Sequence, residues 1–319
     1  MRPTRRVVVY GSLGLRPGLS ELLWAFRKRN KLEEFPVYLD DHPFQVRERI
    51  DSERKHGLKT ADVVLMPQYM LLGLAKDGLL AEFRPAGSEK YPEEFKDKLS
   101  RWSAIGVTFM SMAYNSARKP RSGLPDSLQE ITPERMGGPL GTQSLTASRA
   151  GNLGVQYLAF LRRRVGARRW RAFVEGLAAP KTVRSYDCID HLIQGLVDGD
   201  NALALGVYSL AYFREKTSGS PVSLLKIDDA PQMFTTTSVG LLKGSEDNAS
   251  AKKFLDFLLG AEAQRIISRI PGISAAMKGL SPAYDFEVEL PAPSDFHPTE
   301  LDVRETVAAL SLFRKLKLP

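Results

Sequence analysis

Short apolar runs alternate with longer segments of helical periodicity along the first third of the chain. The runs are rich in valine and leucine and are bounded by glycine, proline or charged residues, which is typical of buried strands. Because a helical segment follows each run, the pattern predicts a mostly parallel sheet covered by helices on both faces. The predicted strands are residues 6–10, 35–39 and 61–66, and the predicted helices are residues 19–26, 44–54 and 67–76.

The pattern changes at residues 102–115, a long extended stretch rich in Val, Thr, Phe, Met and Tyr that no helix follows directly. We interpret this stretch as the crossing into a second lobe. The elements expected in that lobe are a loop at residues 141–148, helices near 149–165, 167–178 and 187–197, and a strand at 202–208. The elements expected after it are a strand at 234–242 and helices at 249–259, 261–269 and 303–315.

We therefore expect an α/β fold of two lobes, each a mixed sheet flanked by helices, with the lobes joined by crossing hinge strands. The first lobe would comprise residues 1–105 and 233–275, and the second lobe residues 106–232. Residues 276–319 would form a C-terminal segment that packs on one of the lobes.

The composition predicts a globular protein without membrane insertion. Of the 319 residues, 43% are hydrophobic and 26% are charged. The longest apolar runs fall far short of the roughly 20 residues that a membrane-spanning helix needs. The amino terminus, MRPTRR followed by VVVYGSLG, lacks the apolar stretch and the cleavage site of a signal peptide. We therefore expect either that a leader was removed or that the protein stays inside the cell.

The few cysteines and histidines limit the possible chemistry. Cys188 is the only cysteine, which excludes an intrachain disulfide, and we expect it to be a buried structural thiol. The four histidines lie far apart, without the spacing of a metal site. The sequence therefore predicts neither a metal site nor a cofactor.

The formal net charge of +8 favours anionic partners. Arginine is concentrated within residues 162–171, and such a run could indicate a nucleic-acid-binding patch. We interpret it instead as the solvated side of two consecutive helices, because Leu158, Trp170 and Phe173 supply an apolar side. No nucleic-acid-binding motif accompanies the run, so we expect no nucleic-acid partner.

Three stretches, in order and spacing, resemble the ferric-ion-type family of periplasmic binding proteins, which also includes binders of phosphonates, sugar phosphates and thiamine. The most specific stretch is SVGLLKGSEDNASAKKFLDFLLGAEAQ, residues 238–264, which is similar to the family's strand, turn and helix signature. The second is TADVVLMPQYMLLGLAKDGLLAEFRP, residues 60–85, which is similar to the family's ADV strand and following helix. The third, residues 104–115, ends in an Ala-Tyr-Asn like the one that opens the family's second lobe.

The resemblance covers roughly residues 5–275 and implies binding without catalysis. In this family, two α/β lobes joined by two crossing strands enclose a ligand, and the protein delivers it to the permease of an ABC transporter. Closure would sequester the solute from water, and helix N-termini would offer backbone N–H groups to an anion.

Ligand-binding residues of such a protein are expected where strands end and helices begin. Ser12 follows the first strand and could donate its hydroxyl and its backbone N–H to an oxyanion. Gln68 and Tyr69 hold the equivalent place after the third strand. The candidates thus mark one edge of the first lobe.

In the second lobe, the segment before the helix at 149–165 resembles the family segment that holds the anionic part of the ligand. Its candidate residues are Thr146, Ser148 and Arg149. Ser148 could cap the helix with or without a ligand, and Arg149 could form a bidentate pair with a carboxylate or phosphate.

Tyr208 ends a strand, with Ser209 next and Tyr212 one helical turn later, and all three are candidate ligand-binding residues. Family members that bind ferric ion have two adjacent tyrosines at this point, with a histidine and a carboxylate from the first lobe. This chain has Tyr-Ser-Leu-Ala-Tyr in place of the pair and no histidine in GSLGLRPG. We therefore favour a small organic or phosphorylated anion over ferric ion.

We predict the substrate-binding protein of an ABC transporter, which would act as a monomer and hold an organic acid, a phosphonate or a phosphorylated compound. It would lie in the periplasm or at the extracellular surface, or in the cytoplasm if the chain has no leader. The alternatives are a ferric-ion-binding protein of the same family, a cytoplasmic ligand sensor and an enzyme on the same fold. No nucleophile elbow, phosphate-binding loop or dinucleotide-binding glycine motif supports an enzyme.

Overall fold

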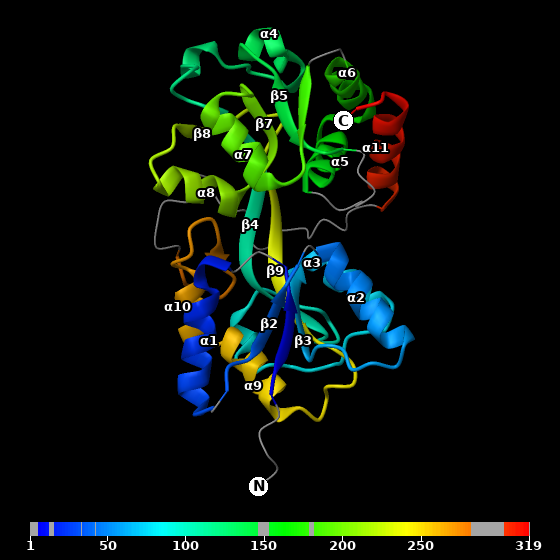
Figure 1. Ribbon diagram of the computed structural model, residues 1–319, viewed down its shortest axis with the longest axis vertical. Coiled ribbons are helices and arrows are strands. Elements are labelled where there is room, and N and C mark those ends of the chain that lie inside the picture. The colour runs from blue at the N-terminus through cyan, green and yellow to red at the C-terminus, as the bar shows by residue number, and fades with distance from the viewer. Residues whose placement is uncertain are drawn as a thin grey trace. The chain divides into compact units, whose positions relative to one another are not determined.

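The chain forms two compact units (Figure 1). The computed structural model describes residues 6–12, 16–32, 34–41, 43–145, 153–178, 182–281 and 303–318. Unit 1 comprises Met1–Thr108 and Thr235–Pro298, and unit 2 comprises Phe109–Phe234 and Thr299–Pro319. Within the described residues, the two points at which the chain passes from one unit to the other lie in two long strands, β4 (Trp102–Asn115) and β9 (Met233–Leu241).

Unit 1 is built on a mixed sheet in which β2 (Val37–Asp40), β1 (Val8–Gly11), β3 (Val63–Pro67) and β9 are neighbours in that order. β1 is parallel to β2 and β3, whereas β9 runs antiparallel to β3. β10 (Ser274–Ala275) pairs antiparallel with β4. The helices of unit 1 are α1 (Arg16–Asn30), α2 (Pro43–Lys55), α3 (Gln68–Lys76), α9 (Ala249–Leu258) and α10 (Ala261–Ile267), with short 3-10 turns at Ser88–Lys90 and Glu93–Phe95.

Helices of unit 1 are held to one another by buried aromatic rings. Phe26 of α1 is fully buried, and its ring lies 4.9 Å from the ring of Phe254 and 5.5 Å from that of Phe257, both in α9. Burying a side chain of this size stabilises the fold by roughly 1.5–3 kcal/mol. The first and ninth helices are therefore anchored together although they lie far apart in the sequence.

A buried carboxylate, Asp62, ties together three segments of unit 1. It is fully buried at the start of β3, where it accepts hydrogen bonds from the Val8 N–H and the Ser245 hydroxyl, both at 2.9 Å. The ammonium group of Lys59 lies 3.3 Å from Oδ1 of Asp62, the oxygen that also accepts from Ser245. These partners compensate the cost of burying a charge, so Asp62 fixes β1 and the turn after β9 beside β3.

Unit 2 is built on the remaining strands, in the order β4, β7 (Leu203–Tyr208), β5 (Leu140–Gln143) and β6 (Val183–Tyr186). β7 runs antiparallel to β4, and β5 lies between β7 and β6, parallel to both. β8 (Val222–Leu225) also pairs antiparallel with β4. The helices are α4 (Pro133–Met136), α5 (Leu153–Val165), α6 (Ala167–Leu177), α7 (Ile189–Asp198), α8 (Ser209–Thr217) and α11 (Val303–Lys315), with 3-10 turns at Arg121–Gly123 and Leu128–Glu130.

In the core of unit 2, the buried Trp170 and Tyr157 side chains each have hydrogen-bond partners for their polar atoms. The indole N–H of Trp170 donates to the Leu158 carbonyl at 2.7 Å, which holds α6 against α5. Tyr157 is fully buried, and its hydroxyl donates to the carbonyls of Ala230 and Pro231 at 3.2 Å each. Burial raises the pKa of Tyr157 well above its usual range, so this hydroxyl remains a donor.

Several predicted elements are confirmed, and two have the predicted bounds: the strand at 102–115 and the helix at 303–315. The predicted loop at 141–148 is wrong at its start, because Gly141–Gln143 belong to β5. Cys188 is only partly buried, at the N-cap of α7, so the expectation of a buried thiol is also wrong. The predicted C-terminal segment 276–319 is divided, with its described residues up to Ser281 in unit 1 and α11 in unit 2.

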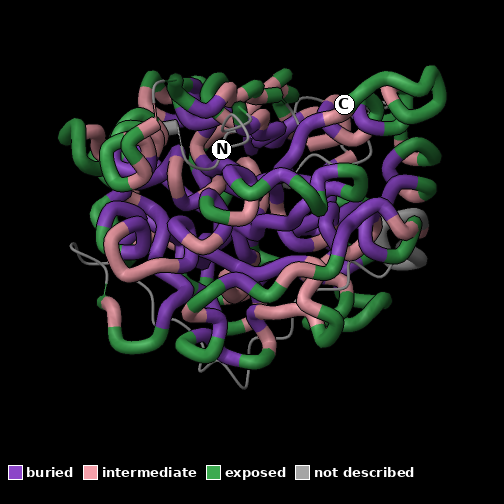
Figure 2. The backbone as a smooth tube through the Cα atoms, turned by 90° about the horizontal axis from the view of Figure 1, so that it is seen from below, coloured by how far each residue is buried: buried purple, intermediate pink, exposed green. Residues whose placement is uncertain are grey.

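Most strand positions are buried, except in β2 and β6, and the exposed positions lie mainly at turns and on the outer sides of helices (Figure 2). All positions of β4 are buried. In the part of the chain that the structure describes, no helix is both long and apolar enough to cross a membrane. The arginine run at 162–171 lies on the exposed sides of α5 and α6, as predicted.

Candidate functional site

The carboxyl ends of β1 and β3 lie side by side in unit 1 because the two strands are parallel neighbours. Ser12 follows β1 and is buried, and its backbone N–H donates to the Leu65 carbonyl of β3 at 3.0 Å. That N–H is therefore engaged within the sheet, and the predicted donation to an oxyanion rests on the hydroxyl alone. Gly11 before it has no room for a side chain, since a Cβ atom would lie 1.9 Å from the Tyr38 hydroxyl.

Gln68 lies at the carboxyl end of β3 as the first residue of α3, and only 3% of its surface is exposed. Its Oε1 accepts a hydrogen bond from the Thr236 hydroxyl at 3.0 Å, and the Thr236 and Ser238 hydroxyls lie 2.9 Å apart. The amide nitrogen of Gln68 has no hydrogen-bond partner among the described residues. Buried polar groups are nearly always paired, so an unpaired donor at a strand end indicates a group that a ligand could satisfy.

The antiparallel register between β3 and β9 explains how these residues meet. Met66 pairs with Ser238 and Pro67 with Thr237, which brings Thr236 opposite Gln68. Tyr69, the next residue of α3, is half-buried and packs against the unit 1 core. Ser12, Gln68, Thr236 and Ser238 together form what we call the unit 1 polar edge.

In unit 2 the carboxyl ends of β5 and β7 are neighbours in the same way. Thr142 and Gln143 end β5, and both are buried. The Thr142 hydroxyl and the Gln143 Oε1 atom have no hydrogen-bond partner within the described ranges. Two further buried polar atoms are thus available at a strand end.

Tyr208, the last residue of β7, is the N-cap of α8 and is partly buried. Ser209 is fully buried, and its hydroxyl accepts a hydrogen bond from the Phe109 backbone N–H at 3.2 Å. Tyr212 is fully buried as well, with its ring 5.1 Å from that of Phe213 in an edge-to-face arrangement. The geometry gives Ser209 and Tyr212 packing roles and leaves Tyr208 as the accessible member of the three.

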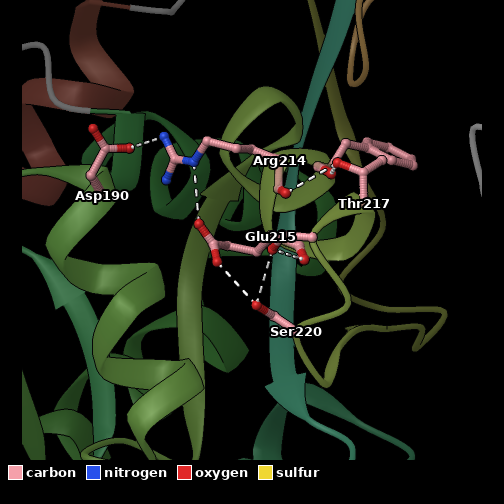
Figure 3. Close-up of polar contacts among 7 residues, drawn as sticks. Asp190, Arg214, Glu215, Thr217 and Ser220 are labelled. Atoms are coloured by element: carbon pink, nitrogen blue, oxygen red, sulfur yellow. Dashed lines mark hydrogen bonds and ion pairs between the residues drawn. The ribbon is translucent and has the colours of Figure 1, made fainter.

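A charged network holds α8 against α7 (Figure 3). The Arg214 guanidinium lies 2.8 Å from Asp190 of α7 and 3.2 Å from Glu215, and the Ser220 hydroxyl donates to Glu215 at 3.1 Å. Burial alone would lower the pKa of Arg214, but its hydrogen bonds to Asp190 and Glu215 raise it overall. Asp190 is 60% exposed, as expected for a residue on the outside of a helix, and the network fixes the helix that begins after Tyr208.

Three predicted residues, Thr146, Ser148 and Arg149, lie outside the described residues. Among the described residues there is no group of three or more His, Cys, Asp or Glu side chains placed to hold a metal ion. Sequence reasoning missed Thr142, because β5 is short, and it also missed Thr236. The run Thr235–Thr236–Thr237–Ser238 at the start of a predicted strand was the available signal, since few buried strands carry consecutive hydroxyls.

Three solved structures show the same fold over almost the whole chain. Iron-bound HitA from Pseudomonas aeruginosa is 21% identical, with a TM-score of 0.77, and the match covers 98% of this chain and 99% of HitA. AfuA from Actinobacillus pleuropneumoniae, with fructose-6-phosphate bound, is 17% identical, with a TM-score of 0.78 and coverage of 98% and 99%. The substrate-binding protein of an ABC transporter from Agrobacterium tumefaciens is 16% identical, with a TM-score of 0.78 and coverage of 99% and 95%.

These likenesses establish an α/β fold of the two-lobed periplasmic-binding-protein type, as the sequence predicted. A search of curated proteins found no match. The family model for bacterial extracellular solute-binding proteins matches residues 59–300, which is more than half of the chain. The protein therefore belongs to the family of bacterial extracellular solute-binding proteins, which bind solutes for ABC transporters.

Proposed function

We propose that this protein captures a small anionic solute and delivers it to the permease of an ABC transporter. The observation that carries the proposal is the buried, unpaired amide nitrogen of Gln68 at the unit 1 polar edge. An N–H donor in a site of low dielectric binds an oxygen of a carboxylate or phosphate strongly, because charge-assisted hydrogen bonds are about twice as strong as neutral ones.

The hydroxyls of Ser12 and Tyr208 supply further donors at strand ends of the two units. Hydroxyl and amide groups are neutral, so they bind an anion without the repulsion that a carboxylate would add. The net charge of +8 attracts anions at longer range. A neutral donor set on a positively charged protein therefore fits an organic acid, a phosphonate or a phosphorylated compound.

The same reasoning separates this chain from a ferric-ion carrier. Ferric ion requires charged oxygen ligands, and this chain has Ser209 where a second adjacent tyrosine would be needed. The Ser209 hydroxyl is already engaged with the Phe109 N–H. We therefore place ferric ion second, although HitA, which is similar in fold, holds iron.

We further propose that the protein works as a monomer in the periplasm or at the extracellular surface, and that it releases its solute chemically unchanged. The family description is that of an extracellular binding protein. Recovery of a bound anion by mass spectrometry with its mass unaltered after prolonged incubation would separate this function from that of an enzyme. A changed mass would contradict it.

A thermal-shift screen of metal-stripped protein tests the proposal. The probes are organic acids, phosphonates, sugar phosphates and ferric ion with bicarbonate, because a ligand that binds only the folded state raises the melting temperature. We expect a shift with one class of anion, its loss in Gln68→Met, and its retention in Gln194→Met, a matched substitution on the exposed side of α7. A shift with ferric ion alone that is lost in Tyr208→Phe would establish the iron carrier instead.

A further inference from the structure

A run of arginines spans the end of α5 and the start of α6, and most of their side chains are exposed. The last turn of α5 carries Arg162, Arg163 and Arg164, and α6, which begins at Ala167, carries Arg168, Arg169 and Arg171. Glu175 is the only acidic residue in the sequence of α5 and α6, against six arginines. The positive charge is therefore not balanced within these two helices.

Three of these six arginines have contacts within unit 2 that account for their charge. Arg169 pairs with Asp229 at 2.6 Å and Arg171 with Glu175 at 3.3 Å, while the Arg162 guanidinium lies 5.7 Å from the centre of the Trp170 ring. The other three, Arg163, Arg164 and Arg168, are exposed, and none has an acidic partner within 4.0 Å in the described part of the chain. These three guanidinium groups remain available to a partner.

The C-terminal helix lies beside α5 and adds further exposed basic residues to this part of unit 2. α11 packs against α5 (Figure 1), and its buried Phe313 lies 5.9 Å from the ring of Trp170. Its end carries exposed Arg314 and Lys315, and Lys317 follows the helix. We use the name basic face for the six exposed side chains Arg163, Arg164, Arg168, Arg314, Lys315 and Lys317.

Helix stability explains only part of the basic face. Basic residues in a last helical turn interact favourably with the helix dipole, which accounts for Arg163, Arg164, Arg314 and Lys315. The same effect disfavours Arg168, because it lies in the first turn of α6. The position of Arg168 is therefore not explained by helix stability.

We propose that the basic face binds the phosphate groups of anionic phospholipids and so holds unit 2 at a membrane surface. Guanidinium groups bind phosphate through two parallel hydrogen bonds, and basic clusters attract anionic bilayers. A protein partner would need an apolar centre, but all the exposed large apolar side chains in the described ranges belong to unit 1. The family works beside a membrane transporter, so a bilayer is a surface that the protein meets.

Co-sedimentation of the full chain with lipid vesicles tests the proposal. The vesicles contain phosphatidylcholine with one fifth phosphatidylglycerol, and vesicles of pure phosphatidylcholine serve as the reference. We expect binding to the anionic vesicles alone, weakened as salt rises to 0.5 M, because screening shortens the reach of the charges. The triple variant Arg163→Glu, Arg164→Glu, Arg168→Glu should bind about 100-fold more weakly.

The matched control changes the same amount of charge on exposed residues of unit 1, as Arg54→Glu, Lys55→Glu and Lys76→Glu. Like Arg163 and Arg164, these residues lie in the last turns of their helices, where a glutamate is disfavoured, whereas Arg168→Glu lies in a first turn, where a glutamate is favoured. The control therefore costs at least as much helix stability as the triple variant. An equal loss of binding in the control would overturn the proposal, since binding would then follow net charge alone. Absence of binding to the anionic vesicles, or capture by immobilised polyglutamate without vesicle binding, would overturn it too, and the second result would assign the face to an acidic protein.

Discussion

Two glutamines of unit 1 are buried to nearly the same extent, yet their surroundings differ. The amide of Gln264, in α10, is fully hydrogen-bonded at both ends, whereas the amide of Gln68 is bonded at one end only. The partners of Gln264 are the carbonyls of Ile105 and Leu258, both at 3.0 Å, and the N–H groups of Ala276 and Met277, at 3.1 and 3.2 Å.

The difference shows what each region contributes. Gln264 binds four backbone groups in three segments, so its amide completes the packing of α10 against β4, α9 and the chain after β10. Gln68 keeps an unpaired buried donor, which costs folding free energy and which we propose a ligand satisfies. Gln264, in the stretch most similar to the family signature, therefore has a structural role. Gln68, which follows β3, is the candidate for ligand binding.

The largest expected effect is that of Gln264→Met, which keeps the size of the side chain and removes its polarity. Four backbone groups would lose their partner within the core, so we expect the free energy of unfolding to fall by about 4 kcal/mol. Urea denaturation followed by circular dichroism measures this change. A loss below about 1 kcal/mol would show that the backbone groups find other partners and would remove the contrast with Gln68.

Asp62→Ala extends the comparison to a buried group that carries a charge. The Val8 N–H and the Ser245 hydroxyl would lose their acceptor, and we expect a destabilisation of about 3 kcal/mol in the same denaturation experiment. Ser245→Ala is the matched control, because it removes one of the contacts and leaves the carboxylate in place, and it should cost about 1 kcal/mol. Equal effects of the two variants would mean that the charge itself adds nothing.

Gln68→Met tests the other side of the comparison. Only the hydrogen bond from Thr236 is lost and an unpaired donor is removed, so the free energy of unfolding should change by less than about 1 kcal/mol. The affinity for the solute should fall at least tenfold, since a donor to an anion is lost. Isothermal titration calorimetry with the anion found by the screen measures the affinity, and unchanged affinity would assign the unpaired amide to the fold alone.

The fold was largely predictable because its strands and helices carry strong local patterns. The stretch Trp102–Asn115 is rich in β-branched and aromatic residues, and the structure makes it one strand with those bounds. β5 was missed because Leu140–Gln143 is short and contains a glycine, so no alternation can be recognised in it. Short buried strands are defined by the neighbours that pair with them, which the sequence does not reveal.

The candidate site residues were predictable from the sequence only where their position at the end of a strand identifies them. Gln68 and Ser12 were placed by the rule that ligands bind at the carboxyl ends of parallel strands. The contact of Gln68 with Thr236 joins residues far apart in the sequence and depends on the register of β3 with β9. Tyr212 is fully buried, which helical spacing alone does not show.

The smallest expected effect concerns Asp97, which accepts as many hydrogen bonds as Gln264 makes but lies nearer the surface. The hydrogen bond from the Arg101 guanidinium, at 2.7 Å, is the main reason that the pKa of Asp97 is lowered, and backbone N–H groups assist it. A lowered folded-state pKa stabilises the fold above the unfolded-state pKa, near 3.8, and this stability is lost as the pH falls through the folded-state value.

Asp97→Asn should therefore cost about 1 kcal/mol at pH 7 and progressively less below about pH 4, where the carboxylate of the unsubstituted protein also gains a proton. Urea denaturation at pH 7, 5 and 3.5 measures this trend. Asp51→Asn is the matched control, because Asp51 also pairs with an arginine four residues away at 2.7 Å but is 49% exposed, so its loss should cost less. If both variants lose the same stability, hydrogen-bond geometry rather than burial sets the contribution of a polar group in this protein, and the contrast between Gln264 and Gln68 must then come from their partners alone.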